Sequence, residues 1–136
     1  MNQSIPDSQK LLRNSLIGNA LFSILSALII LGSSGWLARF LGLRDHIVLT
    51  ILAISLAGYA VILLINARKP KIKISDAWMA VILDAIWVIG SYALIFVVPL
   101  TFGGKWLIAA VAEIVFVFAI LQSFGIRRVM KSEQAT

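Results

Sequence analysis

The sequence contains no cysteine and a single histidine, His46, among its 136 residues. Without cysteine, disulfides and thiolate metal sites are excluded. Haem and zinc sites depend heavily on histidine and cysteine ligands, so this chain barely supplies a ligand set for either. We therefore expect no metal and no cofactor. His46 follows Arg44 and Asp45 and is expected to be a solvated loop residue.

Charged residues are also scarce, at 13% of the chain against 60% hydrophobic residues, and the mean hydropathy is +0.98. A soluble domain carries about 25% charged residues, so about half of the usual solubilising surface is missing. The net charge of +6 comes from basic residues that flank apolar segments instead of forming one stripe. This pattern favours a membrane surface over nucleic acid as the partner.

Long apolar runs take the place of the missing charge. Crossing a bilayer requires about 20 mostly apolar residues, and four segments qualify: 15–34, 47–67, 77–100 and 106–126. Backbone groups in lipid must be satisfied internally, which predicts helices, and the runs are too long and lack the alternation of strands. We expect an all-α fold: an integral membrane four-helix bundle that forms one transmembrane domain over residues 1–136.

The basic residues predict the orientation of this bundle. Nine of them fall on one side of the expected membrane: Lys10, Arg13, Arg68, Lys69, Lys71, Lys73, Arg127, Arg128 and Lys131. The other side has three: Arg39, Arg44 and Lys105. Because cytoplasmic loops are enriched in Lys and Arg, we expect a multi-pass protein of the plasma (inner) membrane with both termini in the cytoplasm. The run from Arg68 to Lys73 either contacts anionic lipid headgroups or serves only as the orientation signal.

The loops and chain ends give further expectations. Residues 35–46 either form a short interfacial helix or continue the first membrane helix, with Trp36 at the interface in both cases. Pro99 is expected to end the third helix, and Gly103-Gly104 to form a tight turn. The two ends, 1–8 and 132–136, are expected to be disordered.

The first and third helices match when the chain is shifted by 65 residues. Asn19-Ala20-Leu21-Phe22 then falls on Asp84-Ala85-Ile86-Trp87, and a serine follows one turn later in each, at Ser26 and Ser91. A duplication would give two parallel-repeat helical hairpins, related by an axis along the membrane normal. The alternative is chance similarity between apolar helices. If the duplication is real, Asn19 and Asp84 occupy equivalent positions in the two hairpins.

Two motifs carry a resemblance to a known group of proteins. They are Arg13-Asn14-x-x-x-x-Asn19-Ala20 and Asp84-Ala85-Ile86-Trp87-Val88-Ile89-Gly90-Ser91. Over most of its length the chain resembles uncharacterised small four-helix bacterial membrane proteins, of the kind classed as domains of unknown function. The resemblance implies the four-helix fold and carries no activity.

Ionisable groups at membrane depth are costly and usually face protein or water. Asp84 lies roughly 10 Å inside the cytoplasmic boundary of its segment, and Asn19 enters from the same side to a similar depth. We expect a polar cluster of Asn19 and Asp84 with Asn66 or Gln122, and Asn19 as the direct partner of Asp84. This cluster is either a proton, cation or ligand site, or a set of interhelical hydrogen bonds that fixes helix register.

Glu113 lies at a different level, roughly 10 Å inside the outer boundary. Gln122 follows nine residues later, which places it on the opposite helix face at 100° per residue. We expect Glu113 to face protein, either inside the bundle or across a contact in a homo-oligomer or larger membrane complex. The alternative is a carboxyl kept protonated in an apolar setting.

No catalytic set is visible, because the chain lacks a histidine pair, a Gly-x-Ser-x-Gly motif and a phosphate-binding loop. We expect a non-enzymatic module that binds membrane lipid, a pigment or another membrane protein. The alternative is a small proton-coupled transporter or channel subunit that uses Asp84 and Glu113.

Overall fold

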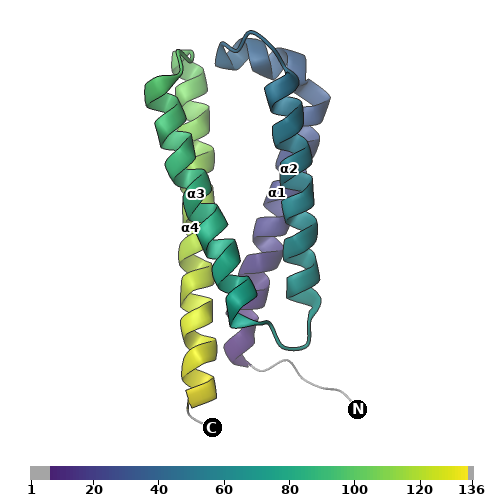
Figure 1. The fold of residues 1–136 in the computed structure, drawn as a ribbon, viewed down its shortest axis with the longest axis vertical. Helices are drawn as coiled ribbons and strands as arrows, with labels where there is room; N and C mark the ends of the chain where they lie inside the picture. The colour runs from purple at the N-terminus through teal and green to yellow at the C-terminus, as the bar shows by residue number, and fades with distance from the viewer. Residues whose placement is uncertain (1–6, 135–136) are drawn as a thin grey trace.

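The computed structural model describes residues 7–134, which form four helices and no strand. They are α1 (Asp7–Leu41), α2 (Ile47–Arg68), α3 (Ile74–Val97) and α4 (Phe102–Gln134). All four are long and apolar enough to cross a membrane, which confirms the predicted all-α four-helix architecture (Figure 1). The described chain therefore fits a multi-pass membrane protein.

The outside of the helices is apolar, as a lipid environment requires. Leu28, Ile54, Ile89 and Phe96 are 62%, 63%, 69% and 85% exposed, respectively, and each lies on one of the first three helices. Apolar area in water is unfavourable by about 25 cal/mol per Å². A soluble protein rarely exposes so much of it in contiguous patches, whereas a bilayer solvates it.

Several helix ends differ from the predicted ones. α3 ends at Val97 instead of residue 100, because Pro99 disfavours a helical residue before it, and Val98 is extended, with φ −93° and ψ 137°. α4 begins at Phe102 instead of residue 106, so Gly103 and Gly104 lie in its first turn and not in a loop. The Thr101 hydroxyl caps this turn by accepting the Gly104 N–H at 2.9 Å.

The predicted disorder at the chain ends is wrong for the residues that the structure describes. α1 already includes Ser8, and α4 continues through Ser132 to Gln134. Glu133 on this extension pairs with Lys71 at 3.2 Å, so the extension contacts the middle loop. Residues 1–6 and 135–136 lie outside the described part of the chain.

The first loop combines both interpretations of its sequence. α1 continues to Leu41, but Ser33 has non-helical angles (φ −130°, ψ 22°), and the segment after it turns across the end of the bundle (Figure 1). Trp36 and Phe40 stack outward with ring centroids 5.3 Å apart. Leu37 and Leu41 are buried on the opposite side. The kink thus makes a short amphipathic segment, 34–41.

The bundle has two ends that carry loops. The terminal end carries Asp7, Gln134 and the loop 69–73, and the far end carries the loops 42–46 and 98–101. α1 packs against α2 and α4, and α3 packs against α4, but α2 and α3 hardly touch. They are close only near the terminal end and diverge toward the far end (Figure 1).

Glycines explain why α1 and α4 lie so close together. A Cβ added at Gly125 of α4 would lie 2.7 Å from Leu12 Cα, and one at Gly104 would lie 3.0 Å from Leu41 Cα. Because glycine has no side chain, α1 and α4 approach each other closely at these two positions. Gly58 of α2 and Gly90 of α3 meet nothing within 4 Å.

The terminal end is held together by the middle loop and the start of α1. Arg13 donates to the carbonyl oxygens of Ala67 and, at 3.3 Å, Pro70. The Ile72 N–H donates to Gln9 Oε1 at 3.4 Å, and Ile72 is 1% exposed. These contacts anchor the α2–α3 connection on α1, so the divergence of α2 and α3 begins from a fixed point.

The close α1–α4 contact predicts a large effect of a single methyl group. Gly125→Ala should destabilise the protein by about 1–3 kcal/mol, since an overpacked site forces backbone shifts and the two nearest contacted atoms are backbone atoms of Leu12. Gly90→Ala is the matched control, because its methyl meets no atom within 4 Å and alanine favours helix. Thermal unfolding in detergent measures both; equal midpoints for the two variants would contradict the packing argument.

Candidate functional site

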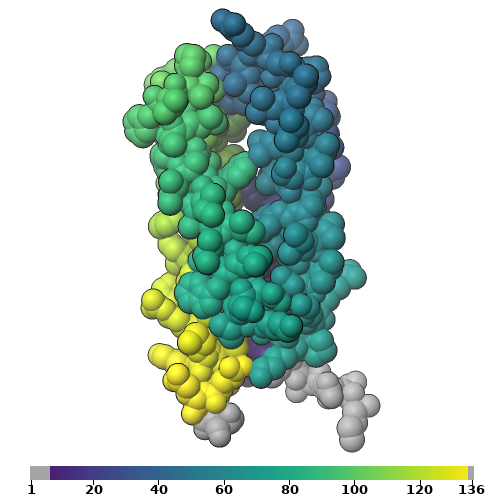
Figure 2. Space-filling model, in the orientation of Figure 1, coloured from purple at the N-terminus to yellow at the C-terminus, as the bar shows by residue number. Residues whose placement is uncertain are grey.

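A cavity of about 860 Å³ lies between the α1–α2 hairpin and the α3–α4 hairpin and is lined by residues of all four helices. It exists because α2 and α3 separate toward the far end while the other helix pairs remain packed. The molecular surface is visibly hollowed between α2 and α3 (Figure 2). The opening faces sideways, toward the region that lipid would occupy.

The walls of this cavity are mostly aliphatic. Four serines also line it: Ser23, Ser26, Ser55 and Ser91. Two of them are satisfied within their own helix, since Ser55 donates to the Ile51 carbonyl at 2.9 Å and Ser91 to the Trp87 carbonyl at 2.8 Å. The segment 34–41 contributes Leu37 and Leu41, which cover the far end of the cavity.

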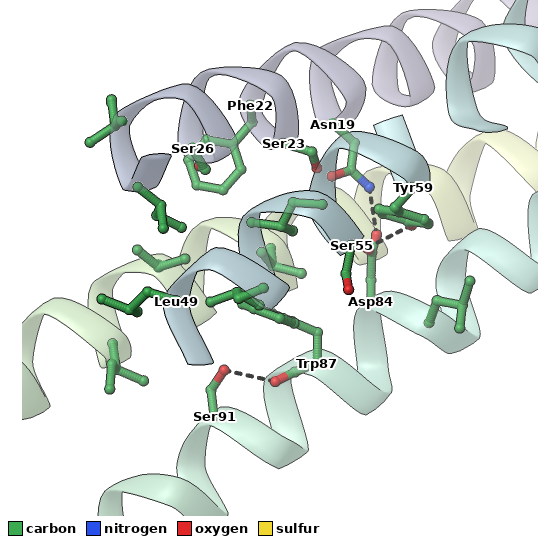
Figure 3. Close-up of a pocket in the computed structure, with 18 of the residues that line it drawn as sticks. Asn19, Phe22, Ser23, Ser26, Leu49, Ser55, Tyr59, Asp84, Trp87 and Ser91 are labelled. Atoms are coloured by element: carbon green, nitrogen blue, oxygen red, sulfur yellow. Dashed lines mark hydrogen bonds between the residues drawn. The ribbon is translucent and has the colours of Figure 1, made fainter. Parts of the chain in front are cut away.

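One end of the cavity is polar. Asp84 is 2% exposed, and its carboxylate accepts hydrogen bonds from the three other helices. Asn19 Nδ2 of α1 lies 2.8 Å from Oδ2, and Gln122 Nε2 of α4 lies 3.2 Å from the same oxygen. The Tyr59 hydroxyl of α2 donates to Oδ1 at 2.9 Å. Figure 3 shows Asn19, Tyr59 and Asp84 converging at this end.

The sequence correctly placed part of this cluster. The expected contact between Asn19 and Asp84 is present, and Gln122 joins it. Asn66, the other proposed partner, is partly buried and makes no hydrogen bond to Asp84 within residues 7–134. It lies about 10 Å nearer the terminal end than Tyr59, at 1.5 Å rise per residue. Whether the cluster is a functional site stays a prediction.

Tyr59 is the member of the cluster that the sequence interpretation missed. It lies nine residues before the end of α2, and Asp84 lies ten residues after the start of α3. The two residues are therefore at nearly the same depth. Asn19 and Asp84 are paired by the same method, which counts residues from the terminal end. Depth counted from the middle loop would have selected Tyr59 over Asn66.

Glu113 lies apart from the cavity. Its side chain is on the exposed surface of α4, where the Tyr92 hydroxyl of α3 donates to Oε1. Gln122 is fully buried, so the two residues do occupy opposite faces of the helix. Of the two expected placements of Glu113, the one inside the bundle is wrong, because Gln122 takes the inward face. A subunit contact over Glu113 stays a prediction.

The basic run of the middle loop is partly neutralised. Lys69 pairs with Asp76 at 3.1 Å and Lys71 with Glu133 at 3.2 Å. Arg68 and Lys73 are exposed and form no ion pair among residues 7–134. Two of the four candidate headgroup contacts are therefore free of internal partners.

One polar atom beside the cavity has no partner in the described structure. The Trp87 Nε1–H is buried without a hydrogen-bond acceptor, and Trp87 lines the cavity. Gln122 Oε1 is similarly unpaired within the polar cluster. Buried polar atoms usually find partners, so the Trp87 Nε1–H, which lies on the cavity wall, is available to a polar group that enters the cavity.

Metal binding has no support in the residues that the structure describes, since 7–134 contain no group of three potential acidic, histidine or cysteine ligands. Comparisons with protein-family models, with curated proteins and with solved structures give no match for this chain. Its function is therefore inferred from the cavity and the Asp84 cluster.

The Asn19–Asp84 hydrogen bond predicts coupling between the two positions. Asn19→Asp alone places two carboxyl groups side by side, whereas Asn19→Asp combined with Asp84→Asn restores one carboxyl facing one amide. The double variant should be more stable than the sum of the single effects by about 0.6–1.7 kcal/mol. A double-mutant cycle in detergent measures this coupling. The cycle of Asn66→Asp with Asp84→Asn is the control and should give none; equal values for both cycles would refute the contact.

Proposed function

We propose that this chain is a non-enzymatic membrane protein that binds an apolar or amphipathic small molecule from the surrounding lipid. The observation that supports this is the cavity of about 860 Å³. Ligand sites are typically concave, about 300–1,000 Å³ in volume, and mostly apolar with a few placed polar groups. The cavity has this size and this division of polarity.

The position of the opening favours a ligand that arrives through the membrane. α2 and α3 hardly touch, so a molecule in the lipid reaches the cavity without first separating packed helices. The aliphatic walls suit its apolar part. The Asp84 cluster, at one end, suits a polar group. A lipid, a pigment or another lipophilic molecule meets these requirements.

The alternative function, proton-coupled transport through Asp84 and Glu113, has less support. Asp84 lines the cavity, but Glu113 lies on the outer surface against Tyr92. A path that uses both carboxyl groups would have to cross the packed α3–α4 pair. Of these two carboxyl groups, binding at the cavity involves only that of Asp84.

The orientation of the chain is part of the proposal. The terminal end carries nine of the twelve basic residues, and cytoplasmic segments are enriched in Lys and Arg. We therefore place this end in the cytoplasm of a cell whose plasma membrane holds the protein. Arg68 and Lys73, which have no ion pair within 7–134, would contact anionic headgroups there.

Labelling of single cysteines tests this orientation. The chain has no cysteine of its own, so Ser8→Cys, Lys71→Cys and Arg44→Cys each give one reactive site. A membrane-impermeant maleimide added to intact cells should label the variant at position 44 and leave positions 8 and 71 unlabelled until the cells are opened. Labelling of position 8 or position 71 in intact cells would contradict the proposed topology.

Filling the cavity should displace its occupant. Gly58 lines the cavity and meets no atom within 4 Å, so Gly58→Leu should enter the empty space without disturbing packing. Gly90→Leu is the matched control, since Gly90 also meets no atom but does not line the cavity.

The readout is the fluorescence of Trp87 in a background where Trp36, Trp78 and Trp106 are replaced by phenylalanine. Lipids with brominated acyl chains quench indole on contact, so Trp87 should be quenched when chains occupy the cavity. Gly58→Leu should lower this quenching at least twofold, and Gly90→Leu should leave it unchanged. The proposed function fails if the two leucine variants are quenched equally.

A further inference from the structure

Asp84 has hydrogen-bond donors but no counter-ion. Its donors are two amides and a phenol, all of them neutral groups. The ion pairs among residues 7–134 involve other carboxylates: Asp7, Asp45, Asp76 and Glu133. A charged carboxylate in an apolar setting is costly without a cation. Asp84 therefore has no charge partner among the described residues, and a proton or a cation from outside the chain would neutralise it.

The cavity favours a positively charged occupant over a negative one. Asp84 is the only acidic or basic residue that lines it within the described chain, and no Lys, Arg or His does. An anion would meet the carboxylate, and the unpaired Trp87 Nε1–H on the cavity wall is a neutral donor that supplies no compensating positive charge. The charge on the wall thus selects the sign of the charge on the ligand.

Aromatic rings lie close to the same carboxylate. Tyr59 contacts Asp84 directly, Trp87 follows it by one turn of α3, and Phe22 follows Asn19 by one turn of α1; all three line the cavity. The faces of aromatic rings attract cations, with quaternary ammonium groups as the best-known ligands. The remaining walls are apolar and suit a lipophilic body.

We propose that the ligand of this cavity is a lipophilic organic cation, either a quaternary ammonium or phosphonium ion or a protonated amine, whose charge pairs with the Asp84 carboxylate. The inference rests on the proposed binding function and specifies its ligand class. Binding to protonated Asp84 breaks the carboxyl O–H bond, the proton leaves to the aqueous phase, and the cation remains beside the carboxylate. One positive charge enters the site and one leaves it, so charge balances.

This exchange makes binding depend on pH. The groups that face Asp84 are Asn19 from α1, Tyr59 from α2 and Gln122 from α4, and Tyr59 is the titratable one among them. A free phenol titrates near pH 10. Below about pH 9, affinity should therefore follow Asp84: it increases as pH rises through the titration of the carboxyl group and then levels off.

Two probe ions of the same shape and opposite charge provide the test. Tetraphenylphosphonium and tetraphenylborate are each titrated into the purified full-length protein in a neutral detergent, and saturable binding is measured by calorimetry. The phosphonium ion should bind and release up to one proton per site, detected with a pH indicator in weak buffer. The borate ion should show no saturable binding. Equal binding of the two ions, or binding of the cation without proton release at a pH where Asp84 is protonated, would overturn the proposal.

Substitutions test whether the carboxyl group of Asp84 is the one that pairs with the bound cation. Asp84→Asn should weaken phosphonium binding at least tenfold and remove its pH dependence, while Asp84→Glu should retain both. Glu113→Gln is the control, because its carboxyl group is on the outer surface, and it should bind as the wild type does. The comparison of the two ions on the wild-type protein needs no variant and holds even if Asp84→Asn does not fold.

The outcome also separates this inference from the proposed function. If Gly58→Leu lowers the quenching of Trp87 but the phosphonium ion does not bind, the cavity holds a neutral or zwitterionic lipophile and only the cation proposal falls. If Gly58→Leu has no effect on quenching and the phosphonium ion does not bind, both fall.

Discussion

The carboxylate of Asp84 is the point at which all four helices meet. It belongs to α3 and accepts hydrogen bonds from Asn19 of α1, Tyr59 of α2 and Gln122 of α4. Each such bond in a membrane protein contributes only about 0.6 kcal/mol on average. Their joint effect is geometric, because three donors at one depth allow only one register for each helix. The same group closes one end of the cavity, so the residue that aligns the helices also determines what the cavity attracts.

Glycines of α4 determine how closely the bundle packs on one side, and the other side is open. Gly104 and Gly125 of α4 lie against the backbone of α1, near the two ends of their contact. Gly58 of α2, which hardly touches α3, lines the cavity and has only empty space beside it. A strict twofold relation between the hairpins would make the α1–α4 and α2–α3 contacts equal. The structure departs from that symmetry, and the cavity opens at the contact that is missing.

The sequence predicted the helices and part of the site, for reasons that also explain the failures. Hydropathy reports the length of apolar runs, so it found four helices but missed the start of α1 at Asp7 and the α4 extension to Gln134, where polar residues continue the helix outside the apolar run. The continuation of α1 to Leu41 is one of the two alternatives expected for that segment. Depth counting paired Asn19 with Asp84. Residue type alone favours the amide of Asn66 over the phenol of Tyr59 as a partner for a carboxyl group, and so does not indicate Tyr59.

Helical periodicity also placed Glu113 and Gln122 on opposite faces, but periodicity cannot tell which face points inward. The cavity could not be predicted at all. It depends on how far α2 and α3 diverge, which follows from contacts between residues distant in the sequence and not from the character of any one segment.

The kink at Ser33 has a consequence for how the cavity would be supplied. The segment after it turns across the far end of the bundle and places Leu37 and Leu41 over the cavity, while the side between α2 and α3 stays open to the bilayer. A molecule in the surrounding water therefore has no direct access, and occupancy would be governed by its mole fraction in the membrane. Two compounds with equal intrinsic affinity but different partition coefficients would fill the site to different extents, and diluting the protein with additional lipid would empty it at constant total ligand.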